Sequence, residues 1–236
     1  MLDQQNRQAF LARLAEKMGR ASRTEVVGHY PQVNHYPSTR LTELSEQELY
    51  QKFVTTAEQT LVECVATTPQ NAAQDLLQLC EKYQANRIIL NDDQRLVDYG
   101  LTEAISQQYQ HHIWSTQTSQ QNREFATNAD IGIVFAEYGL TESGGIVLFS
   151  KPHYGRSVSL LPKISIVVLK RSTILPRVAQ LSEILHQKAQ QGERMPSCIN
   201  LISGPSSTAD IELVKVVGVH GPIKCAYLII DDKYTA

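Results

Sequence analysis

The sequence predicts an α/β protein with a central, mostly parallel sheet flanked by helices and an N-terminal helical extension. Short, almost wholly apolar runs rich in β-branched residues recur along the second half of the chain, as is typical of strands buried on both faces. Segments with apolar residues at helical spacing separate several of these runs, so strands and helices alternate. A hydrophobic content of 42% over 236 residues suits a globular protein with a sizeable core.

The expected strands are short runs that end at turn-forming or polar residues. The first, RIIL, is closed by the loop signal Asn91-Asp92-Asp93. The full set lies at 87–90, 131–135, 145–149, 164–169, 198–202 and 225–230.

Helices are expected where apolar residues recur every three or four positions. Ser45 and Glu48 have the spacing of a capping box, and the helical pattern behind them continues to Val65. Pro69 opens the next helix, which extends to Tyr83. Further helices are predicted at 7–18, 118–127 and 174–189, with a short one at 208–214.

The chain is expected to consist of an N-terminal helix with an extended arm, residues 1–42, and an α/β domain, residues 43–236. Residues 20–42 contain Gly28, Pro31 and Pro37 but no periodic pattern. Such a segment lies either on its own globular body or on a neighbouring subunit, and the second arrangement gives a homo-oligomer.

Charge and motif content argue against several functional classes. A net charge of −2 gives no electrostatic footprint for nucleic acid or anionic membranes. No apolar run reaches the roughly 20 residues that span a bilayer, and the polar N-terminus lacks a signal-peptide core, so we expect a cytoplasmic protein. The cysteines are scattered and form no C-x-x-C, and metal-ligand histidine pairs and dinucleotide fingerprints are missing. The sequence therefore predicts no metal and no cofactor.

A first candidate loop, residues 137–145, combines acids, hydroxyls and glycines between two strands. Glu142 is the candidate nucleophile or general base. The neighbouring candidates for ligand binding are Thr141, Ser143, Gly144 and Gly145. The alternative is a glycine-rich strand connection with solvated acids.

A second candidate loop, residues 150–162, carries Arg156 and Ser157. The planar guanidinium of Arg156 suits a carboxylate or a phosphate. An internal ion pair that holds the loop in place would use the same side chain equally well.

A third candidate loop, residues 202–222, is the richest in special residues. His220 lies between glycines and could donate a proton near neutral pH. The candidates for ligand binding are Gly204, Pro205, Ser206, Ser207, Thr208, Asp210 and Gly221. A network of turns and caps is the alternative. Because loops at the carboxyl ends of strands form the ligand sites of open α/β sheets, we expect the three loops to line one pocket for a small anion.

Four motifs in the order ESGGIVL, GRSVSLLP, GPSSTADIE and GVHGP resemble the lactate-utilization protein C family, also described as a domain of unknown function. The opening helix FLARLAEKMGR is similar too, so the resemblance covers nearly the whole chain. That family more often has Thr-Gly-Thr where this chain has Ser143-Gly144-Gly145, which weakens the argument from those hydroxyls.

The resemblance implies a fold like that of the ribose-5-phosphate isomerase and CoA-transferase group. It also implies an auxiliary subunit, itself without clusters, that works with two iron–sulfur proteins to oxidise L-lactate to pyruvate. Two alternatives stay open. One is a free-standing enzyme for a phosphorylated sugar, a folate or an acyl-CoA-like ligand, and the other is an interaction module that clasps a partner through residues 1–42.

Overall fold

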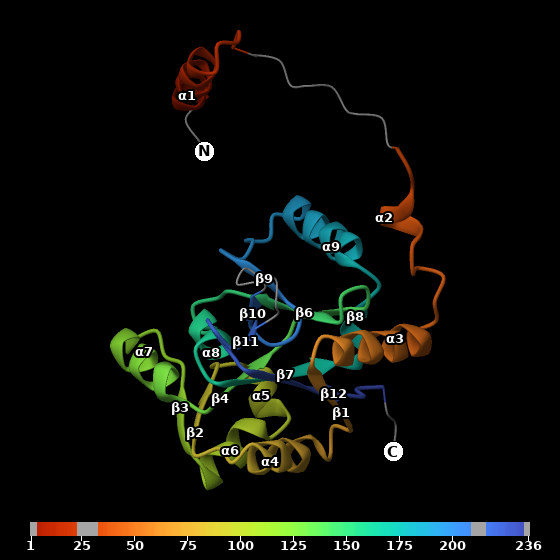
Figure 1. Ribbon diagram of the computed structural model, residues 1–236, viewed down its shortest axis with the longest axis vertical. Helices are drawn as coiled ribbons and strands as arrows, with labels where there is room; N and C mark the ends of the chain where they lie inside the picture. Colours follow the sequence, from red (N-terminus) through yellow and green to blue (C-terminus); the bar gives the residue numbers. More distant parts are fainter. Residues whose placement is uncertain (1–3, 23–32, 209–215, 234–236) are drawn as a thin grey trace. The chain divides into compact units, whose positions relative to one another are not determined.

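The computed structural model describes residues 4–22, 33–208 and 216–233 (Figure 1). The chain divides into two compact units, one ending at His35 and the other beginning at Tyr36. The first unit contains helix α1 (Gln4–Lys17), which includes most of the helix expected at 7–18. The second unit contains all the remaining elements described below.

A six-stranded sheet forms the centre of the second unit. Its order is β1 (Val62–Thr67), β12 (Lys224–Ile230), β7 (Ile164–Lys170), β4 (Ile131–Phe135), β2 (Arg87–Leu90) and β3 (Gln110–Ile113). Every neighbouring pair in this sheet is parallel, which confirms the predicted parallel sheet. The apolar runs predict this arrangement because side chains on both faces of a covered sheet must be apolar.

Helices cover both faces of this sheet (Figure 1). One face packs against α4 (Ala72–Lys82), α5 (Gln94–Asp98) and α6 (Leu101–Gln108). The other face packs against α3 (Glu46–Gln59), α7 (Ser119–Asn128) and α8 (Arg156–Leu160). On that second face the rings of Phe53 and Tyr227 stack with centroids 5.9 Å apart, joining α3 to β12.

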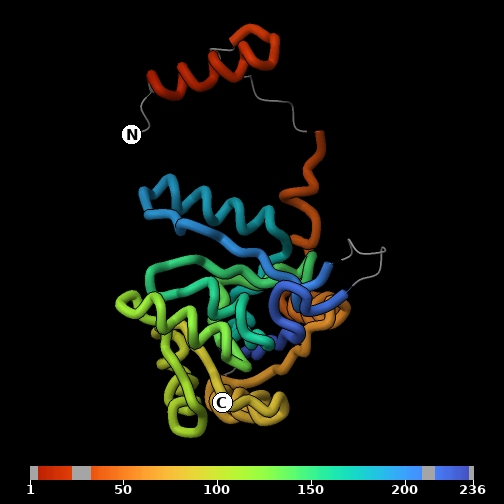
Figure 2. The backbone as a smooth tube through the Cα atoms, turned by 60° about the vertical axis from the view of Figure 1, so that its left-hand side comes forward, coloured from red at the N-terminus to blue at the C-terminus, as the bar shows by residue number. Residues whose placement is uncertain are grey.

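A second sheet lies beyond this face. Its order is β8 (Ile174–Leu175), β5 (Tyr138–Leu140), β6 (Gly145–Phe149) and β9 (Ile199–Ile202). Helix α9 (Val178–Gln190) covers it through Leu181, which packs on Leu140 and Val147. Figure 2 shows the chain reversing after α9 and running back beside it into β9.

Two predicted strands, 145–149 and 198–202, belong to this second sheet and not to the central one. β6 pairs antiparallel with both β5 and β9. The connection between β5 and β6 is only four residues long, which allows a hairpin but is too short for the crossover that a parallel pair needs. The fold class is as predicted, but the sheet is divided in two.

Helix boundaries differ from the sequence pattern in two places. The helix expected to reach Val65 ends at Gln59, because Leu61 adopts a positive φ of 69° and the β-branched segment after it forms β1. The helix expected from residue 174 starts at Val178, and Ile174–Leu175 pair with β5 instead. Thr208, the start of the expected short helix, lies in strand β10 (Ser207–Thr208), while residues 209–214 fall outside the described residues.

The remaining small elements complete the second unit. Strand β10 pairs antiparallel with β11 (Val216–Val217). Helix α2 (Tyr36–Thr39) lies within the segment expected to be extended, and a 3-10 turn spans Arg171–Thr173. Across the described ranges, none of the helices has the length and hydrophobicity that a bilayer crossing requires.

Candidate functional site

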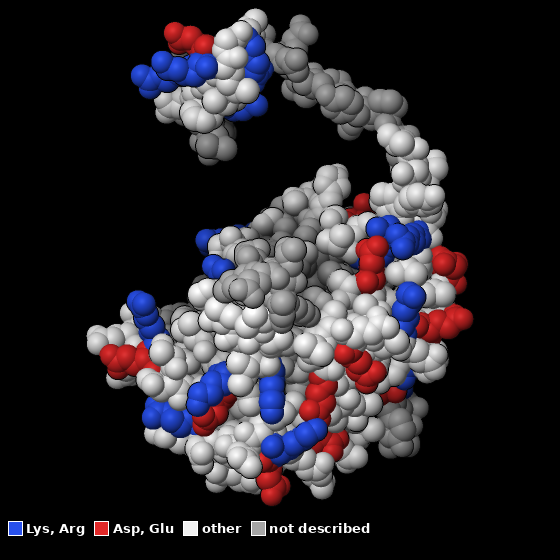
Figure 3. Space-filling view, viewed as in Figure 1, with Lys and Arg blue, Asp and Glu red and all other residues white. Residues whose placement is uncertain are grey.

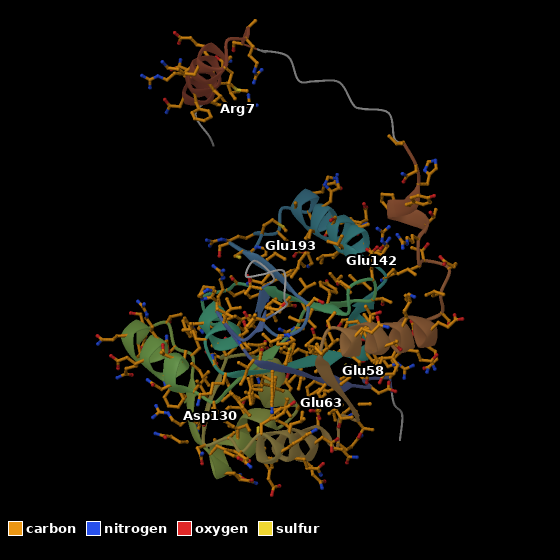
Figure 4. The ribbon with its side chains drawn as sticks, viewed as in Figure 1. Arg7, Glu58, Glu63, Asp130, Glu142 and Glu193 are labelled. Carbon is orange, nitrogen blue, oxygen red and sulfur yellow. The ribbon has the colours of Figure 1, made fainter. Side chains whose placement is uncertain are left out.

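The first candidate loop lies at the beginning of β6 and is bound closely to its surroundings. Thr141 is fully buried, and its hydroxyl donates to the Leu49 carbonyl at 3.3 Å. The Glu142 carboxylate accepts a 2.8 Å hydrogen bond from Arg177 and lies 3.9 Å from Arg40. Its side chain is 33% exposed, and Figure 4 shows it beside the N-terminal end of α9. Glu142 is therefore an ion-paired carboxylate that solvent still reaches.

Ser143, Gly144 and Gly145 join this loop to two neighbours. The Ser143 carbonyl accepts a 2.7 Å hydrogen bond from the Ser203 hydroxyl, while the Ser143 hydroxyl accepts one from the Gly145 amide at 3.3 Å. Gly144 has a φ of +59°, and a Cβ there would lie 2.3 Å from the Ala57 backbone nitrogen in α3. This close approach requires glycine.

The third candidate loop meets the first one. Gly204 and Pro205 are buried, and Ser206 exchanges backbone hydrogen bonds with Pro222 at 2.9 Å and Gly218 at 2.7 Å. A Cβ on Gly221 would contact the Ser206 side chain at 3.1 Å. Since Ser203 also bonds to Ser143, the structure brings these two loops together.

The other predicted members of this loop have different surroundings. Ser207 and Thr208 pair with Val217 and Val216 in the small β10–β11 sheet. His220 is exposed. Asp210 lies outside the described residues.

The second candidate loop begins away from the first one, although its end lies near the third loop, where a Cβ on Gly221 would be 3.5 Å from the Leu160 carbonyl oxygen. It follows the other end of β6, and the five residues of that strand separate it from Glu142 by about 17 Å. Arg156 is exposed at the start of α8 and Ser157 is partly buried. Within the described ranges, no hydrogen bond or ion pair joins Arg156 or Ser157 to the first loop.

Sequence reasoning missed a polar cluster at the carboxyl ends of β2 and β4. The Arg95 guanidinium donates to Asp93 at 2.7 Å and to Glu137 at 3.1 Å, and it lies 4.5 Å from the Phe135 ring centroid. The Asp93 side chain is 1% exposed. This arrangement holds the loop after β2 against the loop after β4.

The same region contains a partly buried tyrosine, Tyr154. Burial and the neighbouring Asp93 charge together raise the pKa of Tyr154 to about 12, against the opposing effect of Arg95. Tyr154 therefore stays a neutral phenol. From β2 the chain continues to β3 at one edge of the central sheet, whereas the next strand of that sheet after β4 is β7, on the other side. Ligands of open α/β sheets bind where the strand order reverses in this way.

A cleft of about 730 Å³ opens beside this cluster. It lies between the ends of β6 and α9 and the segment that leads into β9. Figure 4 labels Glu193 at this end of α9, opposite the end where Glu142 lies. The lining residues are Glu137, Tyr138, Phe149, Ser150, Lys151, Pro152, Leu185, Lys188, Glu193, Arg194, Met195, Pro196 and Ser197.

The polar groups of the cleft are only partly paired. Lys151 lies 3.4 Å from Glu137, and Lys188 lies 2.8 Å from Glu193. The Ser150 hydroxyl oxygen is buried without a hydrogen-bond partner in the described part of the chain. The sequence signalled part of this cleft, because Glu137 and Tyr138 belong to the first candidate loop and residues 150–152 to the second. The lining residues between Leu185 and Ser197 carried no such signal.

Thiol and acid side chains do not gather into a metal-ligand set within the described ranges, where no three His, Cys, Asp or Glu residues cluster. Burial raises the pKa of Cys64, Cys80 and Cys225 to about 12 each. These three thiols are protonated at neutral pH in the structure described. Figure 3 shows basic and acidic side chains interspersed over the visible face.

Comparison with known proteins gives consistent matches along most of the chain. The family model of the LUD domain matches residues 50–230. YkgG, an uncharacterized protein of Escherichia coli, is 49% identical over 228 residues, covering 96% of this chain and 99% of YkgG. Lactate utilization protein C of Halalkalibacterium halodurans is 41% identical, covering 97% of this chain and 99% of that protein. The Bacillus subtilis protein of the same name is 36% identical, with coverage of 97% and 98%.

A solved structure shares the fold. The crystal structure of a DUF162 family protein from Deinococcus radiodurans matches with a TM-score of 0.56 at 16% identity. The match covers 79% of this chain and 99% of that chain.

Proposed function

Because this chain belongs to the LUD-domain family, we propose that it is an auxiliary subunit of a lactate-utilization system in the cytoplasm. The observation that carries the proposal is the nearly full-length similarity, at 36–41% identity, to proteins named lactate utilization protein C. Similarity that extends over both units of the chain supports a shared role for the whole protein and not for one domain alone.

In this proposal the system oxidises L-lactate to pyruvate, a reaction that releases two electrons and two protons. Iron–sulfur partner proteins accept the electrons. The sequence supports a role without clusters of its own, since its four cysteines are widely spaced and form no C-x-x-C pair.

The region where the first and third loops meet is our candidate for binding a small anion. Ser143, Ser203 and Ser206 lie there beside two glycines, and Arg177 and Arg40 supply positive charge. Hydroxyls, backbone amides and guanidinium groups are the usual partners of carboxylates and phosphates.

A deletion strain tests the proposed role. Removing the protein should abolish growth on L-lactate but leave growth on another carbon source unchanged, and the tagged full chain should co-purify with iron–sulfur proteins. Full growth of the deletion strain on L-lactate would contradict the proposal. Re-expression of the intact chain, which should restore growth, is the control.

The N-terminal arm is our candidate for contacting partners or a second copy. Its helix α1 belongs to a unit separate from the α/β body. A chain lacking residues 1–42 should lose co-purification or change its oligomeric state. If both are retained, the arm has no such role.

A free-standing enzyme is the second candidate, since one third of the Glu142 side chain is exposed and accessible to a substrate. Its substrate would be a phosphorylated sugar, a folate or an acyl-CoA-like compound. Glu142→Gln should then abolish turnover of the isolated protein and leave binding nearly intact. Unchanged turnover would remove Glu142 from the mechanism.

A further inference from the structure

We infer that the cleft between the ends of β6 and α9 binds an organic anion with a flat apolar body. This inference goes beyond the proposed function and does not depend on it, because the cleft uses none of the residues assigned to the small-anion site. Nothing in the comparisons assigns a ligand to this part of the molecule.

The walls of the cleft are suited to an apolar body. The rings of Tyr138 and Phe149 contact each other with centroids 6.3 Å apart and an angle of 60°, and both line the cleft with Leu185 and Met195. Aromatic and flexible apolar side chains of this kind accept a planar ring by stacking and by thioether contact. The volume of about 730 Å³ lies within the range of sites for cofactor-sized ligands.

The charge of the cleft favours an anion. Its cations are Lys151, Lys188 and Arg194, and its carboxylates are Glu137 and Glu193. Each lysine has a carboxylate partner, and Glu137 is in addition held by Arg95 from outside the cleft. Arg194 is exposed and has no ion-pair partner within the described ranges, so a cation is left for a ligand.

Ser150 supplies a second, independent argument. Its buried hydroxyl has no partner in the described structure, and an unsatisfied buried polar group costs about 1–3 kcal/mol. The residue lines both the large cleft and a small neighbouring cavity beside Asn91 and Tyr154. When the Ser150 side chain turns toward the cleft, a polar atom of a ligand gives the hydroxyl the partner it lacks.

The size of the cleft argues against lactate itself as the occupant. A three-carbon acid could contact Arg194 or Ser150 but would leave the aromatic wall facing water. The shared chemistry of a suitable ligand is one carboxylate, sulfonate or phosphate group attached to an aromatic or similarly flat apolar body.

Fluorescence titration of the full chain with 1-anilinonaphthalene-8-sulfonate tests the inference, since this probe has an anionic group on a flat body. Arg194→Gln should weaken binding by about three- to tenfold, the loss expected for one charge-assisted contact at a partly open site. Arg123→Gln, which removes an exposed arginine from α7, should leave binding unchanged. Equal binding by all three proteins, or equal loss in both variants, would overturn the inference.

A neutral probe separates the two parts of the ligand. N-phenyl-1-naphthylamine has the same flat body without the sulfonate, and it should bind the wild-type protein more weakly than the anionic probe and be indifferent to Arg194→Gln. Comparable binding of both probes would refute the anionic part. L-lactate at millimolar concentration should not displace the anionic probe. Displacement would refute the requirement for a flat apolar body in the ligand. Neither test uses growth on lactate as a readout, so both are independent of the proposed function.

Discussion

The two ends of β6 contain similar kinds of residues but use them differently. At the beginning of the strand, the polar groups of Thr141, Glu142 and Ser143 are bonded to other parts of the chain. At its end, the Ser150 hydroxyl has no partner in the described structure and Arg194 has no ion pair there. A large cleft adjoins the second end.

This difference shows that a dense motif and an available binding surface are separate properties. Glycines and hydroxyls at the first end allow the loops to pack closely on α3 and on each other. The groups left over for a ligand at the second end come from segments that are distant in sequence. We therefore expect substitution of the closely packed Gly144 at the first end mainly to change stability, and substitutions at the second end mainly to change binding of the anionic probe.

The largest effect is expected for Gly144→Ala. The new Cβ would lie 2.3 Å from the Ala57 backbone nitrogen, and the residue has a φ of +59°. Because a backbone atom cannot move aside without shifting α3, the free energy of unfolding should fall by about 3–5 kcal/mol. Chemical denaturation followed by circular dichroism measures this change.

Gly192→Ala is the matched control. Its φ is +78°, but nothing lies within 4 Å of the added Cβ, so it should cost only about 1–2 kcal/mol of backbone strain. Equal losses in the two variants would show that the first end of β6 is not closely packed against α3.

A smaller effect is expected for the pair Glu142 and Arg177. Both side chains are partly shielded, with 33% and 17% exposed, and Arg177 also donates to the Tyr36 carbonyl at 2.8 Å. A double-mutant cycle with Glu142→Gln and Arg177→Gln should give a coupling energy of about 1 kcal/mol, since exposed pairs give less and buried ones more. A coupling of zero would mean that Glu142 is free for another role.

The central sheet could be predicted well from the sequence because its signal is local. Four of its six strands, β2, β4, β7 and β12, match the predicted bounds to within one residue, since a short apolar run closed by polar residues is sufficient to define each of them. The other two were missed, because β1 lies partly in a segment expected to be helical and β3 lies outside the expected strands.

The assignment of strands to sheets and the composition of the cleft could not be predicted, because both depend on contacts between distant segments. β6 looks like any buried strand, and its antiparallel partners β5 and β9 show only in the fold. The hydroxyl of Ser150 and the guanidinium of Arg194 are 44 positions apart in the chain, and no spacing rule connects them.

At the second end, Ser150→Ala should modestly increase stability and weaken binding of the anionic probe. Removal of an unpartnered buried hydroxyl should raise the free energy of unfolding by up to about 1 kcal/mol. Affinity for the anionic naphthalene probe should fall. Ser159→Ala is the control, because the Ser159 hydroxyl donates to the Arg156 carbonyl at 3.2 Å, and its loss should lower stability. A change of stability in the same direction in both variants would show that the Ser150 hydroxyl is not unpartnered.

The smallest effect is expected for the pH dependence of binding at the second end. The hydrogen bond and charge of Glu193 raise the pKa of Lys188 above its ordinary value of 10.5, so this lysine is protonated below that pH and loses its charge only above it. Arginine does not deprotonate in proteins, and the lining of the cleft contains no histidine. Affinity for the anionic probe should therefore be constant between about pH 6 and pH 9. A decrease centred near the ordinary pKa of histidine would contradict this expectation and would implicate His153 or His186, which follow the lining residues Pro152 and Leu185 in the sequence.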